Sequence, residues 1–150
     1  GSPSVEQIWD EILTSGQIIY GIADDDSHYF KRIGDKTAPT PGQAWVYVRS
    51  AELTSTAILA ALDRGDFYAS TGVELEDYAL NANSISIGIK GQRSSKYTVQ
   101  FIGSGGSILK ETFENPAVYK FVGNEGYVRA RITESNGKMA WTQPTAVDRR

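Results

Sequence analysis

Three aspartates and the only histidine of the chain stand together, in the order Asp24-Asp25-Asp26-Ser27-His28. Asp26 and His28 are two positions apart, and in an extended segment such side chains point to the same side. A carboxylate oxygen and an imidazole nitrogen on one side can bind one divalent metal ion or bridge two. The alternative is a solvated acidic turn, in which the aspartates hydrogen-bond the next backbone segment. The pattern therefore offers either a metal site with Asp26 and His28 as ligands or a turn.

The two preceding aspartates have the same two interpretations. Three adjacent carboxylates repel one another unless a cation balances them. Asp24 and Asp25 would then orient the metal-bound His28 by hydrogen bonds or join it as ligands. If the motif is only a turn, Asp24 and Asp25 are surface residues that contact solvent.

The composition narrows the chemistry in which His28 can take part. With one histidine and no cysteine, the chain cannot build a zinc site of its own from two or three histidines, a thiolate site or a disulfide. A Ser-His-Asp triad would have to use His28. The net charge of −3 argues against nucleic acid as a partner. No apolar run approaches the roughly 20 residues of a membrane span.

The sequence around the motif predicts helix and strand in alternation over residues 1–75. Ser4 and Gln7 form a capping-box pair in front of the first helix. The run 17–23 is short and mostly apolar, as buried parallel strands are. Spacing and turn residues predict a helix over 5–13, strands over 17–23 and 44–48, a loop over 31–43, a helix over 54–65 and an extended run over 67–70.

Residues 76–150 change to a period of two. Ile85, Ile87 and Ile89 alternate with serine and glycine, and further short runs are separated by Gly, Asn or Pro. Short strands spaced about ten residues apart predict an antiparallel sandwich or barrel. The chain therefore divides into an α/β segment over 1–75 and a β-domain over 76–150.

The first residues, Gly1-Ser2, lack an initiating methionine. This start is typical of a chain cut from a longer protein, so we expect a fragment. The compartment cannot be predicted from it.

Several stretches together resemble the PHP family (polymerase and histidinol phosphatase) of metal-dependent phosphoesterases. Asp26-Ser27-His28 resembles the Asp-x-His that forms the last metal-binding motif of that family. The resemblance is to a two-domain subfamily with a C-terminal β-domain, and the stretches that carry it are 21–28, 45–49, 57–62, 65–72, 127–131 and 137–144.

The resemblance implies an α+β chain. The closing segments of a distorted (β/α)7 PHP barrel would occupy residues 1–75, followed by a small antiparallel β-sandwich over 76–150. Asp26 and His28 would be metal ligands. Ser70 and Thr71 would lie at a substrate pocket near the barrel mouth, or else they would only end a strand at Gly72.

The resemblance also implies a cofactor and partners. The parent protein would hold Zn, Mn or Fe and would hydrolyse a small-molecule phosphate ester or a similar bond with metal-activated water. The other ligands of the family, an early His-x-His among them, are absent from this sequence. The remainder of the barrel would therefore be the partner, and the fragment alone is expected to be inactive and to bind metal only weakly.

A different class of function is a binding module without catalysis. Trp9, Trp45 and Trp141, together with the tyrosines, offer a sugar-binding platform, although their periodic apolar positions favour core packing. In this alternative the β-sandwich recognises a carbohydrate or a protein.

Overall fold

The computed structural model describes residues 1–32, 34–35 and 37–147. Over these residues the helices are α1 (Val5–Thr14), α2 (Ser55–Asp63) and the 3-10 turn η1 (Ser104–Gly106). The strands are β1 (Trp45–Val48), β2 (Phe67–Ser70), β3 (Leu75–Leu80), β4 (Ser84–Ile89), β5 (Tyr97–Gly103), β6 (Ser107–Thr112), β7 (Ala117–Lys120), β8 (Gly126–Glu134), β9 (Met139–Thr142) and β10 (Thr145–Val147).

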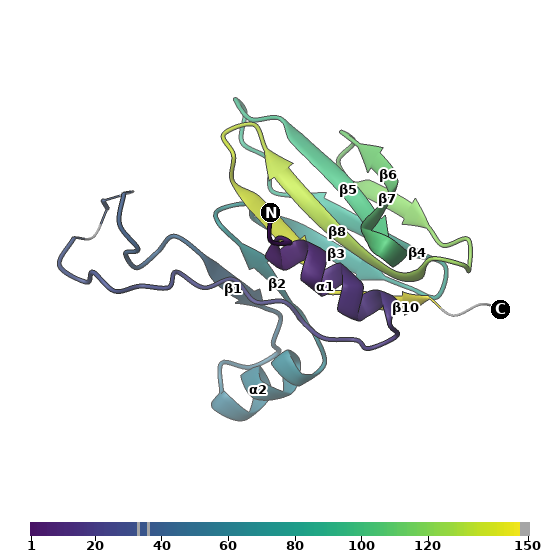
Figure 1. The fold of residues 1–150 in the computed structure, drawn as a ribbon, viewed down its shortest axis with the longest axis horizontal. Helices are drawn as coiled ribbons and strands as arrows, with labels where there is room; N and C mark the ends of the chain where they lie inside the picture. The colour runs from purple at the N-terminus through teal and green to yellow at the C-terminus, as the bar shows by residue number, and fades with distance from the viewer. Residues whose placement is uncertain (33, 36, 148–150) are drawn as a thin grey trace.

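The strands form two facing antiparallel sheets. The larger sheet has seven strands, in the order β1-β2-β9-β8-β5-β6 with β10 on β8, and the smaller has the order β3-β4-β7 (Figure 1). β2 pairs with β9, so the larger sheet draws strands from both sides of residue 75. The prediction of a β-sandwich is confirmed.

The core lies between the sheets, where the period of two places alternate side chains inward. In β4, Ile85, Ile87 and Ile89 are buried while the residues between them are half-buried. From the larger sheet the core takes Val99, Phe101, Val128, Ala130, Ile132 and Ala140.

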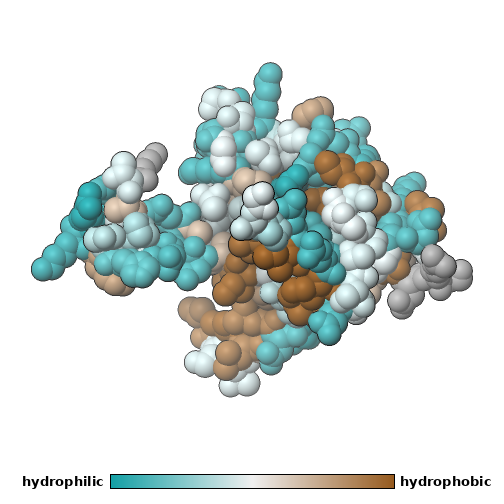
Figure 2. All heavy atoms as spheres, viewed as in Figure 1, coloured by the Kyte–Doolittle hydropathy of each residue, from teal (hydrophilic) through white to brown (hydrophobic). Residues whose placement is uncertain are grey.

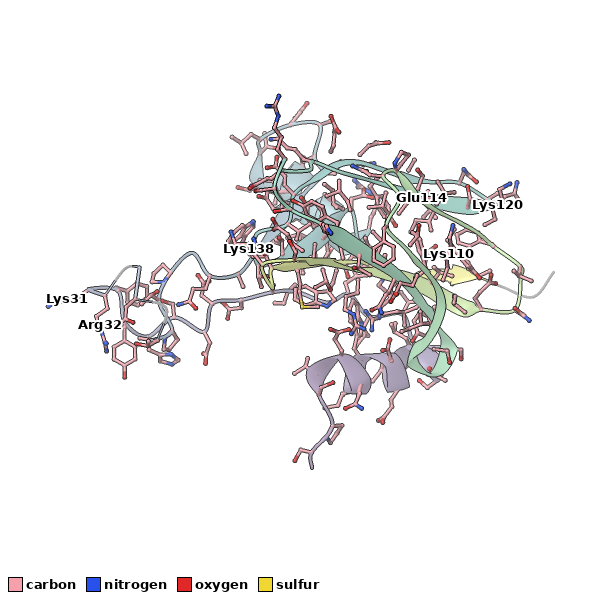
Figure 3. All side chains as sticks on the ribbon, turned by 90° about the horizontal axis from the view of Figure 1, so that it is seen from above. Lys31, Arg32, Lys110, Glu114, Lys120 and Lys138 are labelled. Atoms are coloured by element: carbon pink, nitrogen blue, oxygen red, sulfur yellow. The ribbon has the colours of Figure 1, made fainter. Side chains whose placement is uncertain are left out.

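Helix α1 covers the outer face of the larger sheet, below the strands in Figure 3. The predicted capping box is present: the Ser4 hydroxyl accepts from the Gln7 N–H at 3.2 Å, and the Ser4 N–H donates to the Gln7 side chain at 2.7 Å. The outward-facing residues Tyr127 and Arg129 of β8 lie beneath α1 and are buried by it.

The prediction of closing segments of a (β/α)7 PHP barrel is wrong. Such a barrel needs parallel strands joined by crossover helices, but each strand pairing in the described residues is antiparallel. α2 connects β1 to β2, which are antiparallel neighbours. The predicted strand over 17–23 is extended but belongs to neither sheet in the described part of the chain.

Residues 24–44, here called the arm, project from the body of the sandwich (Figures 1 and 3). Lys31 and Arg32 mark its far end in Figure 3. The predicted loop over 31–43 falls within the arm, and residues 33 and 36 of that loop lie outside the described residues.

Candidate functional site

The predicted metal ligands lie on the arm, where the His28 N–H donates to the Pro39 carbonyl on the returning half of the arm at 3.0 Å. Both side chains are exposed, that of Asp26 by 88% and that of His28 by 64% of its surface. The nearest approach between the Asp26 carboxylate and the His28 Nδ1 is 3.9 Å. The two groups are therefore adjacent and open to anything that approaches the arm.

The imidazole of His28 is oriented by the backbone. Its Nδ1 is hydrogen-bonded to the Asp26 carbonyl oxygen. Because a carbonyl oxygen only accepts, Nδ1 must carry the hydrogen, which leaves the lone pair of Nε2 available. Metal-binding histidines are commonly held in this way, by a carbonyl or carboxylate on the other nitrogen.

Asp26 takes a backbone conformation that residues other than glycine rarely adopt. Its φ is 48°, in the left-handed region that aspartate and asparagine tolerate better than most residues. This conformation turns the Asp26 carbonyl toward the imidazole ring and so produces the bond to His28 Nδ1. Asp26 is therefore not extended, so the expectation that its side chain and that of His28 point to one side of an extended segment does not hold here.

Asp25 fixes the root of the arm. Its carboxylate accepts hydrogen bonds from the backbone N–H groups of Gly42 (2.8 Å), Gln43 (2.6 Å) and Ala44. The bonds from Ala44 and Gly42 hold the pKa of Asp25 below its ordinary value of 3.8. Asp25 is thereby engaged with the returning chain, whereas Asp24 is exposed.

Replacing Asp25 with alanine is expected to loosen the arm without unfolding the sandwich. Amide hydrogen exchange at Gly42 and Ala44 should rise about tenfold or more, because both lose a charged acceptor. The pKa of Asp25 is lower folded than unfolded, so its contribution is present at neutral pH and disappears as the pH falls through the lowered pKa. Asp24→Ala, next to it and exposed, is the control; equal exchange in both variants would contradict the role of Asp25.

The residues present fit part of a metal site. In the described ranges, no three His, Cys, Asp or Glu side chains gather closely enough to hold a metal ion. A catalytic zinc site takes three protein ligands and an open position, and Asp26 and His28 supply two. A complete site needs ligands from a segment outside this group.

The apolar segment (residues 17–23) leads directly into this motif. It is held to the body by side chains: the Trp9 Nε1–H donates to the Ile19 carbonyl at 3.0 Å. The Gln143 amide bonds both the N–H and the carbonyl of Gly21 at 2.8 Å. Among the described residues, no backbone-to-backbone hydrogen bond joins this segment to another.

Large apolar side chains of this region face outward. Ile22 is 73% exposed and Leu59 of α2 is 60% exposed. Figure 2 shows apolar surface gathered over α2, below the root of a mostly hydrophilic arm. Ile18, Ile19 and Tyr20 of the apolar segment and Leu53 before α2 are also exposed, as are Tyr29 and Phe30 further out on the arm.

Ser70 and Thr71 are engaged in the turn after β2. Ser70 is buried, and its hydroxyl donates to the Val73 carbonyl at 2.7 Å. The Thr71 hydroxyl accepts from the Met139 N–H at 2.9 Å. The pocket role predicted for both remains a prediction; the Ser70 bond closes the turn at Val73, and the Thr71 bond connects the end of β2 to β9.

A groove that the sequence did not predict lies beside β1 and β2. It is lined by tyrosines and charged residues and has a volume of about 720 Å³. The indication of this groove in the sequence was the presence of Tyr47 and Tyr68 in two predicted extended runs. In the structure these residues are directly opposite one another in the antiparallel register of β1 and β2.

Comparison with known proteins finds no match: no family model, curated protein or solved structure is similar enough to this chain to place it. None of the helices in the described residues is long and apolar enough to span a bilayer.

Proposed function

We propose that this chain is the C-terminal part of a PHP-like metal-dependent hydrolase, in which Asp26 and His28 supply two ligands of the metal centre. The remaining ligands come from the rest of the parent protein. A divalent ion such as Zn, Mn or Fe supplies Lewis-acid chemistry there for the hydrolysis of a small-molecule phosphate ester or a similar bond.

The observation that carries the proposal is the state of the His28 ring. Its Nδ1–H is bound by the Asp26 carbonyl, so the free Nε2 lone pair is turned away from its own backbone. The Asp26 carboxylate lies within 3.9 Å of the same ring and is also exposed. The oriented ring and the exposed carboxylate beside it support a metal site, and the titration below distinguishes it from a turn, in which a left-handed aspartate is also common.

The apolar segment is a second argument that this chain packs against another part of the parent protein. Its backbone groups are not paired with another backbone in the described residues, and Ile22 is largely exposed. Side chains of the body bond the Ile19 carbonyl and both backbone groups of Gly21, and the remaining N–H and C=O groups of the segment can pair with a sheet edge in another part of the parent protein. Such docking would bring Asp26 and His28, a few residues further along, to the interface where the other ligands lie.

Each residue of the motif then has its own task. In this proposal His28 binds the ion through Nε2, and the Asp26 carboxylate, which lies beside Nδ1 in this structure, changes rotamer to reach the same ion. Asp25 holds the arm root through the N–H groups of Gly42 and Ala44, so that the backbone at the two ligands keeps its position. By itself the chain has too few ligands for hydrolysis.

The test on this chain is a Mn²⁺ titration followed by NMR. We expect line broadening confined to the arm and its root and strongest at the amides of 24–28 and the His28 ring, with an apparent Kd of about 0.1 to 1 mM because two ligands bind weakly. His28→Ala should abolish the broadening, and Asp35→Ala, a change to an aspartate elsewhere on the arm, should leave it. Broadening spread over all exposed carboxylates, or unchanged in His28→Ala, would show that the motif is only an acidic turn.

In the parent protein, His28→Ala is expected to reduce hydrolysis of 4-nitrophenyl phosphate with Mn²⁺ by about a hundredfold or more, since a lost ligand weakens the ion that drives the reaction. Asp35→Ala, at an aspartate elsewhere on the arm, serves as the control. Full activity in the His28 variant would exclude the metal role.

A further inference from the structure

The groove beside β1 and β2 results from the unequal size of the two sheets. Seven strands face three, so the inner face of the end strands extends beyond the smaller sheet. Tyr68 packs against the core from that inner face, and Tyr47 stacks on it with ring centroids 4.9 Å apart. Trp45, two residues before Tyr47 in β1, meets its ring edge-on at 6.1 Å. Trp45, Tyr47 and Tyr68 are aromatic side chains of the kind that ordinarily fill a core, yet here they are only half-buried.

The opposite wall of the groove is β3, at the edge of the smaller sheet. Arg49, which follows β1, donates to the Tyr78 carbonyl at 2.7 Å and lies over the Tyr78 ring at 5.9 Å. This contact blocks the free edge of β3 at Tyr78 against the addition of a peptide strand. Burial raises the pKa of Tyr78 to about 12, so its hydroxyl stays protonated and can donate.

The charges around the groove are mixed in sign and partly paired. Arg64 bonds Asp66 at 2.9 Å, and Lys90 bonds Glu74 at 2.8 Å. Glu76 is exposed on β3 and adds a carboxylate. Arg64 and Lys90 are thus paired with carboxylates, and Arg49 lies over a tyrosine ring. Because these positive charges are already engaged, the groove disfavours an anionic ligand.

We propose that this groove binds a neutral oligosaccharide. A pyranose ring has apolar C–H faces that stack on aromatic rings, here offered by the face of Tyr47 that is turned away from Tyr68, which itself lies between Tyr47 and the core. Its hydroxyls both donate and accept, which matches a rim of guanidinium donors and carboxylate acceptors such as Arg49 and Glu76. The inference uses neither Asp26 nor His28 and stands independently of the metal site.

Isothermal titration and NMR with neutral hexasaccharides of glucose, xylose and mannose test the proposal. At least one is expected to bind with a Kd of about 0.1 to 1 mM, and Trp45 fluorescence should change because its ring contacts Tyr47. Tyr47→Ala should weaken binding about tenfold or more. Glu76→Gln, an exposed change that leaves the fold intact, should weaken it severalfold.

Tyr29→Ala, which removes an exposed tyrosine of the arm, is the matched control and should bind normally. The proposal is overturned if no hexasaccharide binds at about 10 mM, or if Tyr29→Ala weakens binding as much as Tyr47→Ala. Saturable binding of choline without any saccharide binding would also overturn it, since the groove would then be a cation site. The Mn²⁺ titration of His28 is unaffected by any of these outcomes.

Discussion

Replacing Asp10 with alanine is expected to lower the free energy of unfolding by about 3 to 5 kcal/mol, since it leaves a buried charge uncompensated. Arg129 is only 1% exposed. Its Nε and Nη2 donate to the two Asp10 carboxylate oxygens at 2.8 and 2.7 Å, a bidentate pair. The Tyr127 hydroxyl donates to the same carboxylate at 2.7 Å. Without Asp10, both donors lose their acceptor.

The remaining contacts of Arg129 do not replace that carboxylate. Glu6 accepts from Nη2 at a longer 3.1 Å, and the Trp9 ring lies 4.7 Å from the guanidinium carbon. Nη1 has no hydrogen-bond partner in the described structure. Desolvation lowers the pKa of Arg129, but Asp10 and Glu6 raise it further, so the net pKa is raised and the residue stays charged.

Urea denaturation of Asp10→Ala and of the exposed neighbour Glu11→Ala checks this expectation. Glu11→Ala should change stability by less than about 0.5 kcal/mol. The double variant Asp10→Leu with Arg129→Met should recover much of the loss, because an apolar pair of similar size needs no compensation. A loss below about 1 kcal/mol in Asp10→Ala would mean that water enters and solvates Arg129.

Asp10 also connects stability to the candidate site. α1 holds the apolar segment through Trp9, whose Nε1–H bonds the Ile19 carbonyl and whose ring would lie 3.0 Å from a Cβ at Gly21. If α1 separates from β8, the segment before Asp26 loses this anchor. Hydrogen exchange in Asp10→Ala should therefore rise first in α1 and the apolar segment.

Local signals in the sequence predicted the elements that short-range physics controls. The capping box at Ser4 and Gln7 places the start of α1, because it satisfies backbone donors within one turn. The alternation around Ile85 and Ile87 places β4, because period two is what a strand with one buried face needs.

The direction and pairing of the strands could not be predicted from such local signals. The apolar segment has the composition of a buried parallel strand, but composition does not say whether a partner strand exists. In this structure its polar backbone contacts come from the side chains of Trp9, in the preceding helix, and of Gln143, which is far along the chain. The prediction of a barrel came from the resemblance to the PHP family, with which a parallel strand over this run agreed.

The role of Arg129 was equally hidden. Its alternation with apolar residues correctly places it on one face of β8, but a polar face is ordinarily solvated. Only the packing of α1 over that face makes it a buried ion pair. The groove at Tyr47 likewise depends on the unequal number of strands in the two sheets, a property that no local pattern records.

Glu125 is the second residue whose replacement is expected to have a large effect. Its side chain is 3% exposed and accepts from the Tyr119 hydroxyl at 2.9 Å and from the N–H groups of Val122, Gly123 and Asn124. Glu125→Gln places an amide N–H₂ against some of these donors. We expect a loss of about 3 kcal/mol at pH 7 by urea denaturation, since bonds to a charged group are each worth about 1.5 to 3 kcal/mol.

The pH dependence of this loss separates the charge of Glu125 from its shape. Burial raises the pKa of Glu125, but the N–H groups of Val122 and Gly123 and the Tyr119 hydroxyl outweigh it, so the net pKa is below the ordinary 4.5. A carboxylate with a lower pKa in the folded state stabilises above its unfolded pKa and loses that contribution as the pH falls through the folded value. The difference in the free energy of unfolding between wild type and Glu125→Gln should therefore shrink as the pH falls below about 4.5.

Glu114→Gln, at an exposed glutamate (Figure 3), is the control, and its difference from wild type should not shrink with falling pH. A difference for Glu125→Gln that stays constant from pH 7 to about pH 3 would assign the loss to packing and not to the ionised carboxylate.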